Sequence, residues 1–121
     1  MINIAVIGSR SFNDYELLQK HMQQFSDIAA IVSGGAIGAD SLAERYAAEN
    51  SIQMIVFKPD YEKHGRAAPF VRNTAIIEAS DVVIAFWDGK STGTLDSIKK
   101  ARKLGKPVTI VEYLRQELDF L

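Results

Sequence analysis

Glycine recurs at three points of the chain, each where a short apolar segment ends, and serine or threonine hydroxyls and one arginine lie in or next to these loops. The segments ending at residues 7, 33 and 86 are followed by "GSRSF" (8–12), "GGAIGAD" (34–40) and "WDGKSTGT" (87–94). Glycine lets another group approach the backbone closely, and the first turn of a helix offers unpaired N–H groups and the positive end of its dipole. These residue types favour the binding of a phosphate or a ribose.

Several side chains in the three loops could contact such a ligand. The hydroxyls of Ser9 and Thr94 can donate hydrogen bonds, and the guanidinium of Arg10 matches a phosphate or a carboxylate. Asp40 and Asp88 could accept from ribose hydroxyls. Each loop alone also has a structural interpretation as a turn or a helix cap. Three such loops at one end of the same predicted sheet favour a ligand site.

Standard nucleotide and metal signatures do not match. The glycine spacing is neither G-x-G-x-x-G nor G-x-x-x-x-G-K-[ST], which disfavours a standard NAD enzyme and a P-loop NTPase. The sequence has no cysteine, and its two histidines, His21 and His64, are far apart. We therefore expect no metal site and no cofactor.

A long polar connection, "KPDYEKHGRAAPFVRN" (58–73), follows the third apolar segment. Connections of this length in a compact domain are often functional. A helix starting near Pro69 would carry Phe70 on its apolar stripe and place Arg72 and Asn73 in its first turns. Taken alone, these two polar residues favour a solvated helix face. Trp87, at the end of the fourth segment, could either stack on a base or pack in the core.

Five apolar segments rich in valine and isoleucine alternate with segments of helical period. The apolar segments are 2–7, 29–33, 52–57, 82–86 and 108–111. Continuous rather than alternating apolar residues are typical of parallel strands that are covered on both faces. The pattern predicts an α/β fold: a Rossmann-like three-layer domain with a mostly parallel five-stranded sheet flanked by helices. In such folds ligands bind beyond the carboxyl ends of the strands, where the three loops should meet.

Length and charge limit the protein class and its partners. The 121 residues fit one domain, 1–121, and 14 basic against 15 acidic residues give a net charge of −1. This balance disfavours bulk attraction to nucleic acid or to an anionic membrane, so neither is expected as a partner. No apolar run approaches the roughly 20 residues of a membrane span, and the N-terminus does not resemble a signal peptide, so we expect a cytoplasmic protein. The segment "YLRQELDFL" (113–121) could form a helix that mediates a homodimer or a higher homo-oligomer, or it could pack on its own sheet.

Three separated motifs resemble those of a known family. They are "IVSGGAIGADSLAERYA" (31–47), "GRAAPFVRN" (65–73) and "SDVVIAFWDGKSTGT" (80–94). They are similar, in the same order, to motifs of the YspA group, the cpYpsA-related family of the SLOG superfamily, which is named after the DprA/Smf and LOG proteins. The resemblance extends from the first strand to "GKPVTIV" (105–111). It implies a Rossmann-like sheet and a pocket for a nucleotide-derived ligand, and it moves Arg72 and Asn73 from the surface into the site.

The resemblance leaves the activity open, because the superfamily includes ligand sensors, DNA-binding proteins and LOG-type enzymes that cleave an N-glycosidic bond. The LOG pattern, P-G-G-x-G-T-x-x-E, ends in a glutamate that works in this cleavage. Here Ser97 stands at the glutamate position, and Asp96 lies one residue earlier, about 100° away around a helix. Because an oxocarbenium-like centre needs a nearby carboxylate, this difference disfavours the same hydrolysis.

Our leading hypothesis is a binding domain, non-catalytic or weakly catalytic, that senses or sequesters a nucleotide-derived signalling ligand. One alternative is a hydrolase that cleaves an N-glycosidic or phosphoester bond in a nucleotide. Another is a single-stranded nucleic-acid binder, suggested by the basic residues of segment 58–72. No catalytic residue is assigned. The predicted ligand-binding residues are Ser9, Arg10, Gly34, Gly35, Gly38, Asp40, Arg72, Asn73, Asp88, Gly89, Gly93 and Thr94.

Overall fold

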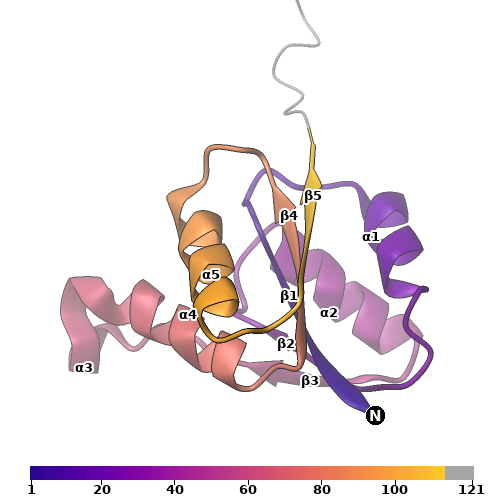
Figure 1. The fold of residues 1–121 in the computed structure, drawn as a ribbon, viewed down its shortest axis with the longest axis horizontal. Helices are drawn as coiled ribbons and strands as arrows, with labels where there is room; N and C mark the ends of the chain where they lie inside the picture. Colours follow the sequence, from indigo (N-terminus) through magenta and orange to yellow (C-terminus); the bar gives the residue numbers. More distant parts are fainter. Residues whose placement is uncertain (114–121) are drawn as a thin grey trace, which may run out of the picture.

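The structure is a computed structural model that describes residues 1–113. The expectations for the C-terminal segment, a helix and self-association, concern residues 114–121 almost entirely and so lie outside the described residues. Five parallel strands form one sheet in the order β3-β2-β1-β4-β5 (Figure 1). They are β1 (Ile2–Gly8), β2 (Ile28–Ser33), β3 (Gln53–Val56), β4 (Val82–Trp87) and β5 (Val108–Glu112). The predicted strands are thus confirmed, and the sheet is wholly parallel.

Helices connect the strands and cover both faces of the sheet. The helices are α1 (Tyr15–Met22), α2 (Ala39–Glu49), α3 (Tyr61–His64), α4 (Ala68–Glu78) and α5 (Thr92–Lys103), with a 3₁₀ turn, η1 (Gly65–Ala67), before α4. The polar connection that follows β3 therefore contains a short helix and a 3₁₀ turn. In Figure 1, α1 and α2 lie on one side of the sheet and α4 and α5 on the other. The predicted three-layer α/β fold is confirmed.

Alternate residues of each central strand supply two separate cores. On β1, Ile4 and Val6 pack with residues of α1 and α2, whereas Ala5 and Ile7 pack with residues of α4 and α5. All four of these side chains are buried. Since the two faces of a strand alternate, a central strand covered on both sides needs an apolar residue at every position. This requirement explains the continuous apolar segments of the sequence.

The strand order reverses between β1 and β4. From β1 the chain continues through α1 to β2 on one side, whereas β4 lies on the other side of β1 and leads to β5. The connections that leave β1 and β4 consequently diverge to opposite faces of the sheet and open a crevice at their carboxyl ends. Gly8, at the end of β1, has no room for a side chain, because a Cβ atom there would lie 2.6 Å from both the Ala39 Cβ and the Phe86 carbonyl oxygen.

An aromatic stack anchors the loop that follows β1. The Phe12 ring is 1 % exposed and lies on the Phe86 ring of β4, with centroids 4.5 Å apart and planes 22° apart. Tyr113 meets the Phe12 ring edge-on at 5.0 Å. Offset stacked and edge-on pairs stabilise a core beyond the area that they bury. The stack therefore fixes the position of the preceding loop residues against β4.

We predict that Phe12→Ala lowers the free energy of unfolding by about 3–5 kcal/mol, because it removes a buried ring that the neighbouring side chains cannot replace. Urea denaturation followed by circular dichroism measures the loss. Phe12→Leu is the control and should lose much less, since it keeps most of the apolar volume. Equal denaturation midpoints for the two variants would mean that the ring does not anchor the loop.

Candidate functional site

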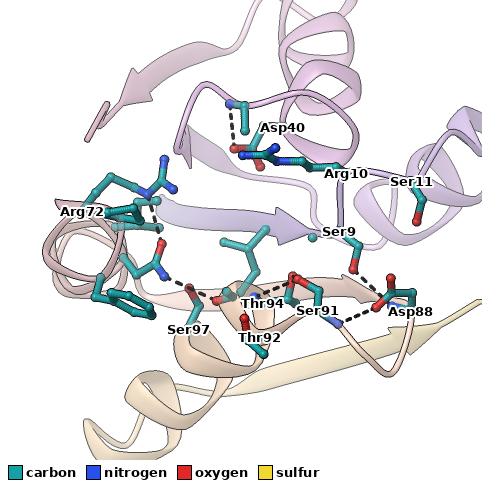
Figure 2. Close-up of a pocket in the computed structure, with 18 residues that line it drawn as sticks. Ser9, Arg10, Ser11, Asp40, Arg72, Asp88, Ser91, Thr92, Thr94 and Ser97 are labelled. Carbon is teal, nitrogen blue, oxygen red and sulfur yellow. Dashed lines mark hydrogen bonds between the residues drawn. The ribbon is translucent and has the colours of Figure 1, made fainter. Parts of the chain in front are cut away.

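A pocket of about 490 Å³ opens at the carboxyl ends of β1 and β4 (Figure 2). Four segments form its walls: the loop after β1, the start of α2, the first turns of α4, and the loop after β4 with the first turn and a half of α5. Small-molecule sites in proteins range from about 300 to 1,000 Å³, and in open parallel sheets they lie where the strand order reverses. Both the volume and the location of this pocket suit a small ligand.

The loop after β1 presents a serine and an arginine to the pocket. The Ser9 N–H donates to the Phe86 carbonyl oxygen at 3.0 Å, which ties this loop to β4. The Ser9 hydroxyl oxygen accepts from the Asp88 N–H at 3.3 Å, so its own hydrogen can still be donated. Arg10 is exposed and makes no hydrogen bond or salt bridge with any residue in 1–113. Its guanidinium can therefore bind a ligand without breaking an existing bond.

The loop between β2 and α2 is organised by one buried carboxylate. Asp40 is 7 % exposed, and its Oδ2 atom accepts from the N–H groups of Gly34 and Ala36, both at 3.1 Å. Burial raises the pKa of the Asp40 carboxyl group above its ordinary value. The two backbone hydrogen bonds and the charge of Arg72 act in the opposite direction but do not reverse the shift.

Protein atoms lie close against two glycines of this loop. A Cβ atom at Gly34 would lie 2.4 Å from the Arg72 Nη1 atom. At Gly38, which has φ of +83°, a Cβ atom would lie 2.5 Å from the Ser9 carbonyl oxygen. None of Gly34, Gly35 and Gly38 lines the pocket. In the structure these glycines shape the loop and leave room for Arg72 and the loop after β1.

A chain of polar contacts joins α5, α4 and the loop after β2. Arg72 donates from Nη1 to the Gly34 carbonyl oxygen at 2.9 Å and from Nε to the Asn73 Oδ1 at 3.0 Å. The Asn73 Nδ2 donates to the Asp96 Oδ2 at 3.1 Å, and Lys100 pairs with that carboxylate at 2.8 Å. Asp96 does not line the pocket, as its place on the helix predicts, whereas Ser97 does.

The loop after β4 turns tightly into α5. The Asp88 Oδ1 accepts from the N–H groups of Lys90 at 2.9 Å and Ser91 at 2.8 Å. Ser91 caps α5, because its hydroxyl accepts from the Thr94 N–H at 3.4 Å. At Gly93 an added Cβ atom would meet nothing within 4 Å. The first turn of α5 thus faces the open volume of the pocket, where its N–H groups can bind an anion.

Two aromatic residues near the pocket have roles that the sequence leaves open. The indole N–H of Trp87 donates to the Ser91 carbonyl oxygen at 3.0 Å, and Trp87 packs against the core beneath α4 and α5 without lining the pocket. Of the two interpretations of Trp87, core packing is therefore correct. Phe70, expected on the apolar stripe of its helix, is 47 % exposed and lines the pocket.

Most of the predicted ligand-binding residues meet at the pocket. Eight of the twelve line it: Ser9, Arg10, Asp40, Arg72, Asn73, Asp88, Gly93 and Thr94. The other four, Gly34, Gly35, Gly38 and Gly89, do not. Ten further residues line the pocket, among them Ser11, Ser97, Pro69, Phe70 and Ile76. Spacing could have indicated the last two, because Phe70 and Ile76 lie three residues before and after Asn73 and so near its face of α4.

Within residues 1–113, no group of three or more histidine, aspartate or glutamate side chains could hold a metal ion. In the same part of the chain, no helix is both long and apolar enough to span a membrane.

Comparisons with known proteins agree with this fold. The family model described as "YspA, cpYpsA-related SLOG family" matches residues 2–64. Gene 61 protein of Mycobacterium phage D29 is 31 % identical over an alignment of 118 residues, and the match covers 89 % of this chain and 94 % of that protein. A solved structure of DNA processing protein A from Helicobacter pylori, which binds single-stranded DNA, is similar with a TM-score of 0.69 and 25 % identity. The similar region covers 90 % of this chain and 64 % of that one.

The expectation that nucleic acid is not a partner is wrong, because a structurally similar protein binds single-stranded DNA. That expectation relied on the net charge of −1. Net charge averages the whole surface, whereas binding depends on the local field and on the groups that line one cleft. A net charge near zero is therefore compatible with a local cluster of basic side chains.

We predict that Asp40→Asn changes how stability depends on pH. Burial makes the folded protein bind the Asp40 proton more tightly than the unfolded chain does, so this group stabilises the wild type below the ordinary pKa of 3.8. That contribution is lost as pH rises from 3.8 through the raised pKa. The asparagine Oδ1 can accept both backbone N–H groups in place of Oδ2 and carries no titrating proton.

Urea denaturation of both proteins at a series of pH values measures this difference. As pH rises through the window, the free energy of unfolding of Asp40→Asn should increase relative to that of the wild type. A difference that is constant across the window would contradict the raised pKa.

Proposed function

The chain belongs to the YspA, cpYpsA-related SLOG family, and we propose that it binds a nucleotide or a nucleotide-derived ligand in the pocket between β1 and β4. The proposal rests on one observation. Arg10, which has no partner within residues 1–113, lines the same pocket as the open first turn of α5, at the strand-order reversal. Each feature alone suits an anion, and together they suit a phosphate group attached to a larger ligand.

The phosphate would lie between the loop after β1 and the start of α5. Thr92 and Gly93 are the first two residues of α5, so their N–H groups have no carbonyl partner within that helix. Ser9 can still donate its hydroxyl hydrogen, and Arg10 supplies a full positive charge. Charge-assisted hydrogen bonds of this type are about twice as strong as neutral ones.

A ribose would lie beside Asp40. The Oδ2 atom of Asp40 already accepts two backbone N–H groups, which leaves Oδ1 for a sugar hydroxyl. The proposed ligand is bound and released intact, since the carboxylate nearest to the LOG glutamate position, Asp96, is bonded to Asn73 and Lys100.

We predict that a nucleotide ligand raises the melting temperature and that Arg10→Ala weakens its binding about 10- to 100-fold, as expected for a lost hydrogen bond to a charged group. A thermal-shift screen with AMP, ADP-ribose and cyclic dinucleotides finds the ligand, because saturation at 100 times Kd adds about 2.7 kcal/mol of stability. Arg102→Ala is the matched control, since Arg102 is an exposed arginine in the last turn of α5, at the opposite end from the pocket. Titration calorimetry then gives Kd for each variant.

Two results would contradict the proposal: no change in melting temperature with any of these ligands, or equal losses of affinity in the two arginine variants. Mass spectrometry of each mixture separates binding from turnover. Recovery of the intact ligand supports a binding domain, whereas release of a free base or of phosphate would assign a hydrolase.

We also predict that Gly93→Val abolishes binding while the protein stays folded. The new side chain meets no protein atom near its Cβ position, so it should project into the pocket, where the ligand would lie. The melting temperature of the free variant should remain within a few degrees of the wild type, and its ligand-induced shift should disappear. An unchanged ligand-induced shift would place the ligand elsewhere.

Single-stranded nucleic acid is a second candidate ligand, favoured by the similarity to DNA processing protein A. One nucleotide of a strand could occupy the same pocket. Three exposed basic side chains next to α4 could contact adjacent phosphates. Lys58 precedes α3, Lys63 lies in α3 and Arg66 lies in η1. Fluorescence anisotropy of a labelled oligothymidylate at low salt tests this candidate. Binding should weaken steeply with added salt, and no anisotropy change at low salt would exclude it.

A further inference from the structure

The two ends of the pocket differ in chemistry. The loops after β1 and β4 contribute hydroxyl groups from Ser9, Ser11 and Ser91, and Figure 2 shows these three serines together on one side. The first turns of α4, marked in Figure 2 by Arg72 on the other side, contribute the apolar side chains of Pro69, Phe70 and Ile76. A ligand that fills the pocket therefore needs one polar end and one largely apolar end.

Phe70 presents an aromatic ring to the apolar end. It is 47 % exposed, although single exposed apolar side chains are common on protein surfaces and need no explanation by themselves. Phe70 differs because it lines the pocket and its backbone is held: Lys100 Nζ donates to the Phe70 carbonyl oxygen at 2.6 Å. The same ammonium lies 5.9 Å from the ring centroid. A positioned ring with an accessible surface can stack on a flat ligand.

Ser97 provides an independent second observation at the same end. It is 2 % exposed, and its hydroxyl makes no hydrogen bond with any residue in the described part of the chain, yet it lines the pocket. Every fully buried side-chain nitrogen or oxygen atom among those residues has a hydrogen-bond partner. Since the Ser97 oxygen has none, it is not fully buried and faces the space of the pocket. Figure 2 shows Ser97 beside Thr94, below the α4 wall. Its hydroxyl can both donate and accept.

We propose that the space between α4 and α5 is a nucleobase subsite, in which Phe70 and Ile76 contact the face of the base and Ser97 hydrogen-bonds to its polar edge. A nucleobase combines a flat apolar face with a rim of donors and acceptors, which is the combination that these side chains complement. This inference rests on the proposed function, because it takes the phosphate to bind at the loops after β1 and β4. It adds that affinity depends on the base as well as on the phosphate.

The test compares AMP with ribose 5-phosphate, which lacks the base, by titration calorimetry. Phe70→Ala should weaken AMP about tenfold, the size expected for one stacked base, and leave ribose 5-phosphate within about twofold. Ser97→Ala should weaken AMP a few-fold and leave ribose 5-phosphate unchanged. Val71→Ala is the matched control, since Val71 is 40 % exposed on the same helix and does not line the pocket. Phe70→Leu keeps apolar bulk without a ring and should resemble Phe70→Ala.

Three results would overturn the subsite, and they separate it from the proposed function. If ribose 5-phosphate binds the wild type as tightly as AMP, the base contributes nothing, although the phosphate site remains. If Phe70→Ala weakens both ligands equally, the ring shapes the pocket without recognising a base. If neither ligand binds the wild type, the proposed function fails for these ligands and the subsite fails with it.

Discussion

The linked contacts of Lys100, Asp96, Asn73, Arg72 and Gly34 hold three walls of the pocket in register. They join α5 to α4 and α4 to the loop after β2, which are far apart in the sequence. Each member is fixed by the next, because the Asn73 amide accepts from a guanidinium on one side and donates to a carboxylate on the other. Such a network favours a pocket that is formed before a ligand binds, and a preorganised site loses less entropy on binding.

In the same network, Arg72 and Asp96 make structural contacts, although their side chains are of types that often take part in reactions. Arg72 donates two hydrogen bonds, to the Gly34 carbonyl oxygen and to Asn73. Asp96 accepts a hydrogen bond from Asn73 and pairs with Lys100. The Arg72 guanidinium is held in place by its two neutral acceptors, whereas Arg10 makes no hydrogen bond or ion pair within residues 1–113 and can move toward a ligand.

The fold was predictable because its causes are local in the sequence. Continuous Val- and Ile-rich segments with helices between them specify a buried parallel sheet, and the strand-order reversal then determines where a ligand lies. The site was predictable only in part. Gly34 and Gly38 stand out in the sequence, but the atoms that exclude a side chain there belong to Arg72 and Ser9, whose proximity only the folded chain reveals. Phe70 satisfies the helical apolar pattern equally well in a core or in a pocket wall.

Chemical-shift mapping tests the central claim most directly. Uniformly ¹⁵N-labelled protein is titrated with AMP, and the backbone amide signals are followed residue by residue. Binding in the pocket predicts the largest shifts in residues 8–11 and 91–97, with smaller shifts in the first turns of α4. A separate cavity of about 320 Å³, lined by residues 25–28, 46 and 50–52, offers a different location. Shifts confined to that cavity, or no shifts at millimolar AMP, would contradict the account.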